Sequence, residues 1–170
     1  MSTEKWFENA DGLTVGEIVE LESQYRIDSL VCAMEARIMN KVYNDMEPTD
    51  EEVVVLAIEA MEREVNNGGF AQFFSNDSWS YIPCLVECLV DIGAIKTKAI
   101  AEEAVSVLGI SPMSESTDPD EYYEKLQEIV EDEEVAEKLE QFDSAYYETG
   151  EDIAGLLFSF VKANIGKFEA

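Results

Sequence analysis

The sequence reads, over residues 64–76, Glu64-Val65-Asn66-Asn67-Gly68-Gly69-Phe70-Ala71-Gln72-Phe73-Phe74-Ser75-Asn76. An apolar pattern with helical spacing runs into this stretch, and the paired glycines interrupt it. Glycine adopts the left-handed conformation that ends a helix without a Cβ clash. The phenylalanines that follow are about one helical turn apart and would turn a short helix back onto the first. The stretch therefore predicts a helix end followed by an aromatic core.

Helical patterns continue on both sides of this stretch. Apolar residues recur every three or four positions, with a slip in phase near Arg26. The predicted helices cover residues 14–43, 49–67, 82–92, 97–108, 118–131, 135–149 and 153–165. No alternating run of strand length lies between them, so we expect an all-α fold of about seven to nine helices. Residues 82–92 carry few charges and are apolar on much of their circumference, so this helix is expected to be the most buried.

Helix starts and breaks are marked by local signals. Thr14 and Thr49 each precede a glutamate by three positions, which is the spacing of a capping box. Asp118 precedes Pro119, a cap followed by a proline in the first turn. A break is expected around residues 132–134. Residues 110–117 contain a proline and several serines and threonines, and they are expected to form a mobile connection.

The length predicts a single domain spanning residues 1–170. Residues 1–13 resemble a loose arm, in which Trp6 and Phe7 are candidate anchors. No run of about 18 apolar residues suggests a membrane span, and the first residues lack the basic and apolar pattern of a signal sequence. We therefore expect a cytoplasmic protein that does not enter a membrane.

The residue types do not favour a metal site or a catalytic centre. Histidine is absent, so neither a Ser-His-Asp nor a Cys-His set is possible. Cys32, Cys84 and Cys88 lie among apolar neighbours, which favours buried reduced thiols over metal ligands. No phosphate-binding or calcium-binding loop is present. The sequence predicts a non-enzymatic protein with no cofactor and no metal.

Charge is the strongest functional signal in the composition. The 170 residues carry a formal net charge of -27, although 46% of them are hydrophobic. This combination is typical of a packed core with a strongly negative surface rather than of a disordered acidic tail. Such a surface repels nucleic acid and anionic lipid and attracts basic proteins, an effect that salt weakens.

The acidic residues form two blocks, residues 1–62 and 115–140. The second holds 12 acidic and 2 basic residues. If residues 118–140 formed one helix, it would be about 35 Å long with one net charge per about 4 Å, against about 3.4 Å along one DNA strand. The candidate partner-binding carboxylates are Asp120, Glu121, Glu124, Glu128, Glu131, Asp132, Glu134 and Glu137. The N-terminal block is a candidate extension of this partner-binding surface. The simpler alternative is that the acidic residues form a solvated face that binds no partner.

The core motif Val65 to Phe74 resembles the bacterial DNA-mimic protein family, small acidic all-helical proteins with a Val-Asn-Asn-Gly-Gly-Phe-x-Gln-Phe-Phe core. Further matches are Ile92-Gly93-Ala94, Phe142-Asp143-Ser144-Ala145-Tyr146-Tyr147 and residues 161–168, so the resemblance covers residues 50–168. It implies a non-enzymatic protein that occupies the DNA-binding surface of a basic transcriptional regulator or nucleoid protein, without binding nucleic acid itself. A homodimer is implied by analogy with the family.

Two other functions remain open from the residues alone. An immunity protein that neutralises a basic toxin such as a nuclease would show the same surface charge. An enzyme or small-molecule binder would need a polar pocket in the segment 66–72. Helix termination and aromatic packing explain the motif residues without such a pocket, and these residues are Asn66, Asn67, Gly68, Gly69, Phe70, Gln72 and Phe73.

Overall fold

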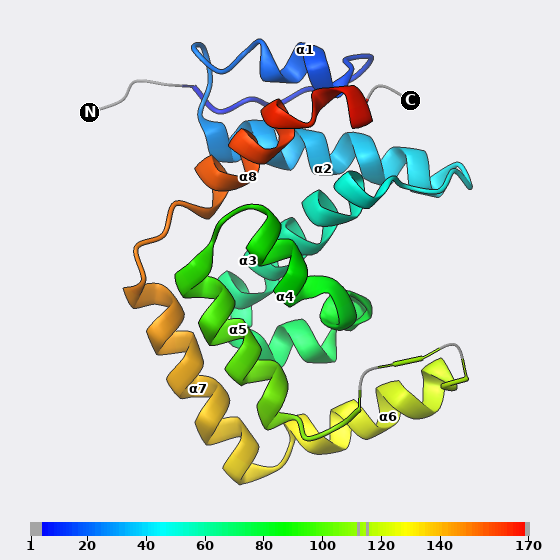
Figure 1. Cartoon of the computed structure of the whole chain (residues 1–170), viewed down its shortest axis with the longest axis vertical. Helices are drawn as coiled ribbons and strands as arrows, with labels where there is room; N and C mark the ends of the chain where they lie inside the picture. The colour runs from blue at the N-terminus through cyan, green and yellow to red at the C-terminus, as the bar shows by residue number, and fades with distance from the viewer. Residues whose placement is uncertain (1–4, 112, 115, 169–170) are drawn as a thin grey trace. The chain divides into compact units, whose positions relative to one another are not determined.

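The computed structural model describes residues 5–111, 113–114 and 116–168, and this part of the chain consists of helices joined by turns and loops (Figure 1). The α-helices are α1 (Val15–Val19), α2 (Ile27–Tyr43), α3 (Asp50–Ser75), α4 (Ile82–Asp91), α5 (Ile95–Val107), α6 (Pro119–Val130), α7 (Glu133–Glu148) and α8 (Ile153–Ala163). Two short 3-10 helices are η1 (Asp77–Tyr81) and η2 (Ile165–Lys167). The described residues contain eight α-helices and no strand, which confirms the predicted all-α fold.

The chain divides into two compact units. The first runs up to Glu59 and resumes at Asp152, and the second comprises Ala60–Glu151. Helix α3 contributes its first ten residues to the first unit and the remainder to the second. The single-domain organisation expected from the length stays a prediction.

In the first unit, α2 packs against α1 and α8 (Figure 1). Leu30, Met34 and Ile38 line the inner face of α2 and are almost fully buried. Leu157 and Val161 of α8 are buried as well. The predicted capping box at Thr14 is present, because Glu17 N–H donates to the threonine side chain and the Glu17 carboxylate accepts from Thr14 N–H.

The prediction of one helix over residues 14–43 is wrong. Helix α1 ends at Val19, and turns lead to Arg26, whose backbone is extended with ψ 136°. Arg26 N–H donates to the carbonyl of Lys5 rather than to a helical carbonyl. The phase slip near Arg26 in the sequence therefore marks a chain break, which lets the apolar faces of α1 and α2 meet.

Residues 5–7 of the expected N-terminal arm contact residues 25–29, at and just before the start of α2. Phe7 N–H donates to Ser29 Oγ at 3.0 Å, and the Phe7 ring meets the Tyr25 ring edge-on at 5.0 Å. The Arg26 guanidinium lies over the Trp6 ring at 5.5 Å. Residues 1–4 of that arm lie outside the described residues.

In the second unit, the glycine pair interrupts α3 as predicted. Gly68 and Gly69 have non-helical backbone angles, and Gly69 has a φ of 78°. Phe70, Phe73 and Phe74 after them are fully buried. Helices α4, α5 and α7 pack side by side in this unit (Figure 1), with α5 contacting both of the others.

Two expectations about helix position and burial need correction. Residues 54–61 of α3 are all buried, whereas Val90 of α4 is 49% exposed, so α4 is not the most buried helix. The apolar residues of α4 lie around most of its own circumference, but one side of the helix faces outward. Helix α5 begins at Ile95, two residues before the predicted start, because the carboxylate of Glu151 accepts hydrogen bonds from the backbone N–H groups of Lys96 and Thr97. No helix of the described residues is long and apolar enough to cross a membrane.

Candidate functional site: an acidic surface on α6 and α7

Two aspartate caps define the helices that carry the candidate acidic residues. Asp118 Oδ1 accepts from Asp120 N–H at 2.9 Å and Glu121 N–H at 3.2 Å, at the start of α6. Asp132 Oδ1 accepts from Glu134 N–H at 3.0 Å and Val135 N–H at 3.2 Å, at the start of α7. The predicted break is confirmed, and residues 118–140 therefore do not form the single 35 Å helix used for the comparison with DNA.

Helix α6 separates its acidic and apolar residues cleanly. Tyr122, Leu126 and Val130 are buried and share one face. At about 100° per residue, the acidic residues fall within an arc of about 100° on the opposite side. They are Asp120, Glu121, Glu124, Glu128 and Glu131, and all five are exposed. Along the helix axis this stripe places one carboxylate per about 4 Å, close to the charge spacing of one DNA strand.

Helix α7 repeats the arrangement. Leu139 and Tyr146 are buried, and Glu134 and Glu137 lie on the opposite, exposed face. Three glutamates absent from the sequence-based selection share that face, namely Glu133, Glu140 and Glu148. The run at residues 131–134 hid Glu133, because adjacent acidic residues point in different directions and only the helix start at residue 133 shows which of them face outward. Glu140 and Glu148 lie beyond this run, and only the side that α7 buries shows that they face outward.

The carboxylates on these two faces are not neutralised by the described residues. Apart from the capping role of Asp132, the eight predicted carboxylates form no hydrogen bond or ion pair with a described side chain. Lys125 and Lys138 are exposed and form no ion pair with described residues either. Helices α6 and α7 meet at residues 131–132 and run away from that corner in different directions (Figure 1). The eight carboxylates, here called the acidic surface, thus lie on the outer faces of two adjoining helices.

Acidic residues of the first unit are compensated more often. Lys41 Nζ lies 2.8 Å from Glu52 Oε2, and Lys162 Nζ lies 2.5 Å from Glu22 Oε2. Arg26 pairs with Asp28 at 2.5 Å. The N-terminal acidic block is therefore a weaker candidate for partner binding than the acidic surface of the second unit.

The glycine and phenylalanine motif lies beneath the two acidic helices, with its polar groups engaged. Phe70 N–H donates to Asp143 Oδ1 of α7 at 2.8 Å. Glu64 Oε2 accepts from the side-chain amides of Gln72 and Asn76, each at 2.7 Å. Asn66 Nδ2 donates to the Glu62 carbonyl at 2.7 Å. These contacts support a structural role for the motif.

Burial also shifts the titration of groups around the motif. Burial raises the pKa of Asp143 above its ordinary value, Glu140 adds to this rise, and the hydrogen bond from Phe70 N–H opposes it. Burial and the neighbouring Glu62 carboxylate raise the pKa of Tyr146, whose hydroxyl donates to Glu62. Asp143 accepts from Phe70 N–H and Tyr146 donates to Glu62, so both groups are held in contacts within the unit, which gives the shifts a structural explanation.

The cysteines differ from the sequence expectation in one respect. Cys88 is buried and Cys84 is half-buried, but Cys32 is exposed, so the prediction of three buried thiols is wrong for Cys32. The Cys32 thiol donates to Glu59 Oε2 at 3.4 Å. Among the described residues, no group of three or more acidic or cysteine side chains is arranged to hold a metal ion.

Comparison with known proteins places the chain in a family. Residues 46–164 match the family model described as DMP19-like protein. No curated protein and no solved structure gave a significant match. The matched region contains the glycine and phenylalanine motif and all eight carboxylates of the acidic surface. Membership implies a DNA-mimic protein, as the resemblance of the core motif predicts, and the chain belongs to the DMP19-like protein family.

Proposed function

We propose that this protein is a non-catalytic DNA mimic whose acidic surface occupies the DNA-binding surface of a basic transcriptional regulator or nucleoid protein. The observation that carries the proposal is the uncompensated stripe of five carboxylates on α6, which continues at the corner onto α7. The second unit as a whole has 22 acidic and 5 basic residues, so the surrounding field strengthens the stripe. The carboxylates stand in for phosphates against lysine and arginine side chains of the partner.

The mechanism is competition for one cationic surface. A partner that binds the acidic surface cannot bind DNA with the same lysine and arginine side chains. Because the contacts are between exposed charges, affinity must fall as salt rises and the Debye length shortens from about 10 Å at 0.1 M to about 3 Å at 1 M. On this proposal the protein acts in the cytoplasm, where the regulator meets DNA, and the homodimer implied by the family resemblance stays a prediction.

The test begins with affinity capture from bacterial cytoplasm at low salt, followed by elution with duplex DNA. The retained protein is then bound to a fluorescent DNA duplex and titrated with the mimic. The α6 variant E124Q/E128Q/E131Q removes three negative charges from the acidic surface while leaving the shapes of the side chains nearly unchanged. The control variant E8Q/E20Q/E47Q removes three exposed negative charges from the first unit, so both variants have the same net charge.

We expect the α6 variant to compete with DNA at least about tenfold more weakly than the wild type, and the control to compete within about twofold of it. Equal loss in both variants would mean that net charge alone matters and would overturn the assignment of the surface. If the captured protein is a basic nuclease whose cleavage is inhibited, the chain is an immunity protein instead. An enzyme centred on residues 66–72 is not favoured, because the amides of Asn66 and Gln72 are hydrogen-bonded within the fold.

A further inference from the structure

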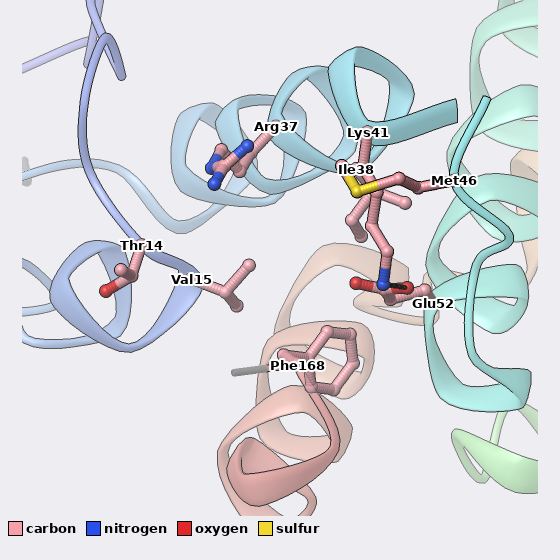
Figure 2. A pocket seen from close by; sticks show the side chains of 8 residues that line it. All are labelled: Thr14, Val15, Arg37, Ile38, Lys41, Met46, Glu52 and Phe168. Atoms are coloured by element: carbon pink, nitrogen blue, oxygen red, sulfur yellow. Dashed lines mark hydrogen bonds and ion pairs between the residues drawn. The ribbon is translucent and has the colours of Figure 1, made fainter. Parts of the chain in front are cut away.

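The first unit contains a pocket of about 340 Å³, and none of the residues that line it belongs to the acidic surface. It is lined by Thr14, Val15, Arg37, Ile38, Lys41, Met46, Glu52 and Phe168 (Figure 2). Its volume lies at the lower end of the range typical of small-molecule sites, about 300–1,000 Å³. The pocket is unusual in this chain because two of its eight lining residues are basic, although the chain has only 11 basic residues in 170.

Lys41 contributes a largely buried cation to the lining of the pocket. Its side chain is only 14% exposed, and its ammonium lies 2.8 Å from Glu52 Oε2 (Figure 2). Glu52, at 4% side-chain exposure, also accepts from Thr49 N–H at 2.8 Å, so the carboxylate is fixed on both sides. An ammonium group has three N–H donors, and only this one bond joins Lys41 Nζ to a described residue. Two donors of a largely buried cation therefore remain for a ligand.

Arg37 supplies the second cation, one helical turn before Lys41 on α2. Its Nε donates to the Leu13 carbonyl at 3.2 Å, which anchors the guanidinium at the start of α1. No described carboxylate pairs with Arg37, and its terminal N–H groups donate to no described acceptor. Since Glu52 neutralises one of the two cations, the pocket carries one net positive charge.

The remaining walls are apolar. Val15, Ile38 and Phe168 are each less than 9% exposed, and Figure 2 shows Val15 and Phe168 directed toward the space below α2. Met46 lies at the edge and is 51% exposed, so its flexible side chain can adapt to a ligand. An apolar surface beside a charged group suits a ligand that has one apolar part and one charged part.

We propose that this pocket binds a small carboxylic acid with an apolar body, whose carboxylate pairs with Arg37, the lining cation that no described carboxylate neutralises. A single negative charge matches the single uncompensated cation, whereas a phosphate monoester would bring a second charge with no partner. The net charge of -27 penalises a dianion further. The apolar body would contact Val15, Ile38 and Phe168, which lie beside the two cations. This inference is independent of the DNA-mimic proposal, because none of its residues belongs to the acidic surface.

The test uses methyl NMR spectra of the whole protein with 3-phenylpropionate as the probe. The neutral analogue 3-phenylpropan-1-ol has the same apolar body and no charge. Arg37→Gln removes the unpaired cation, and Met46→Glu places a carboxylate at the exposed edge, where folding is not at risk. Lys138→Gln removes an exposed, unpaired cation in the second unit and serves as the matched control.

We expect saturable shifts of the Val15, Ile38 and Met46 methyl signals with 3-phenylpropionate. Binding should weaken at least about tenfold for the alcohol and for Arg37→Gln, should be lost in Met46→Glu, and should be unchanged in Lys138→Gln. Shifts that are absent or linear up to about 10 mM would overturn the proposal, since affinity weaker than this is not selective. Equal binding of the acid and the alcohol, or of the wild type and Arg37→Gln, would overturn it as well.

Discussion

Replacing Gly69 by alanine tests how the core motif is held. Gly69 has φ 78° and ψ -177°, a backbone region that is essentially restricted to glycine. A Cβ atom at this position would lie 2.1 Å from Asp143 Oδ2, far inside van der Waals contact. The carboxylate would have to move, and it is the acceptor for Phe70 N–H at 2.8 Å. The substitution therefore strains the backbone and also breaks a partly buried hydrogen bond.

The expected cost is the sum of two contributions. A non-glycine residue in this backbone region costs about 1–3 kcal/mol. A hydrogen bond to a charged group is worth about 1.5–3 kcal/mol, so Gly69→Ala should lower the free energy of unfolding by about 2.5–6 kcal/mol. Gly93 also has a positive φ, 80°, but a Cβ there would meet no atom within 4 Å. Gly93→Ala should cost only about 1–2 kcal/mol and is the matched control.

Urea unfolding followed by fluorescence and circular dichroism measures both changes. Trp6 reports on the first unit and Trp79 on the second, so coincident transitions would also support the predicted single domain. In an Asp143→Ala background the hydrogen bond is already absent and the clash is relieved. Gly69→Ala should then cost only its backbone contribution, about 1.5–3 kcal/mol less than in the wild type. Equal costs in both backgrounds, or a cost no larger than that of Gly93→Ala, would refute the reasoning.

Three further substitutions or reactions give sharp outcomes. Asp132→Ala removes the cap of α7 and should lower the free energy of unfolding by about 1 kcal/mol in urea, whereas Asp132→Asn should nearly preserve it. Partial burial raises the pKa of Glu151, but three hydrogen bonds from Lys96 and Thr97 outweigh it and leave the pKa below its ordinary value of 4.5. The stability that Glu151 contributes is thus present above pH 4.5 and lost as pH falls through the lowered pKa, so the deficit of Glu151→Gln in urea should shrink below pH 4.5. Desolvation of the thiol, and then the Glu59 carboxylate, raise the pKa of Cys32 to about 12, although the residue as a whole is exposed. Mass spectrometry should therefore show iodoacetamide reacting with this thiol at least about a hundredfold more slowly than with a free cysteine at pH 8.

Sequence patterns predicted those helix boundaries whose causes are local. The caps at Asp118 and Asp132 and the glycines after α4 and α5 act on backbone groups within a few residues, so the spacing alone reveals them. The break before Arg26 was misinterpreted, because an apolar pattern with a phase slip fits a distorted helix as well as two helices. The deciding contact joins Arg26 to Lys5, 21 positions earlier, and no local signal marks it.

Some features of the candidate site could likewise be predicted from the sequence, and others could not. Composition identified residues 115–140 as the acidic region, and helical periodicity explains why its carboxylates face outward. The outward face of α7 depends on where that helix starts and which side it buries, so Glu133, Glu140 and Glu148 were missed. The pocket beside Lys41 could not be foreseen, since its walls come from four separate parts of the chain.

The neutral core motif and the acidic surface are joined by the helices that carry the acidic residues. Asp143 and Tyr146, on the inner side of α7, bind Phe70 N–H and the Glu62 carboxylate of α3. Tyr147 of the same helix donates to the Val65 carbonyl at 2.7 Å, and Tyr123 of α6 donates to the Ser75 carbonyl at 2.8 Å. Both helices are thus fixed to the second half of α3 through their inner faces, while their outer faces carry the acidic surface. Helices that are already fixed lose little backbone entropy on binding, so on the proposed function the motif contributes to affinity without touching the partner.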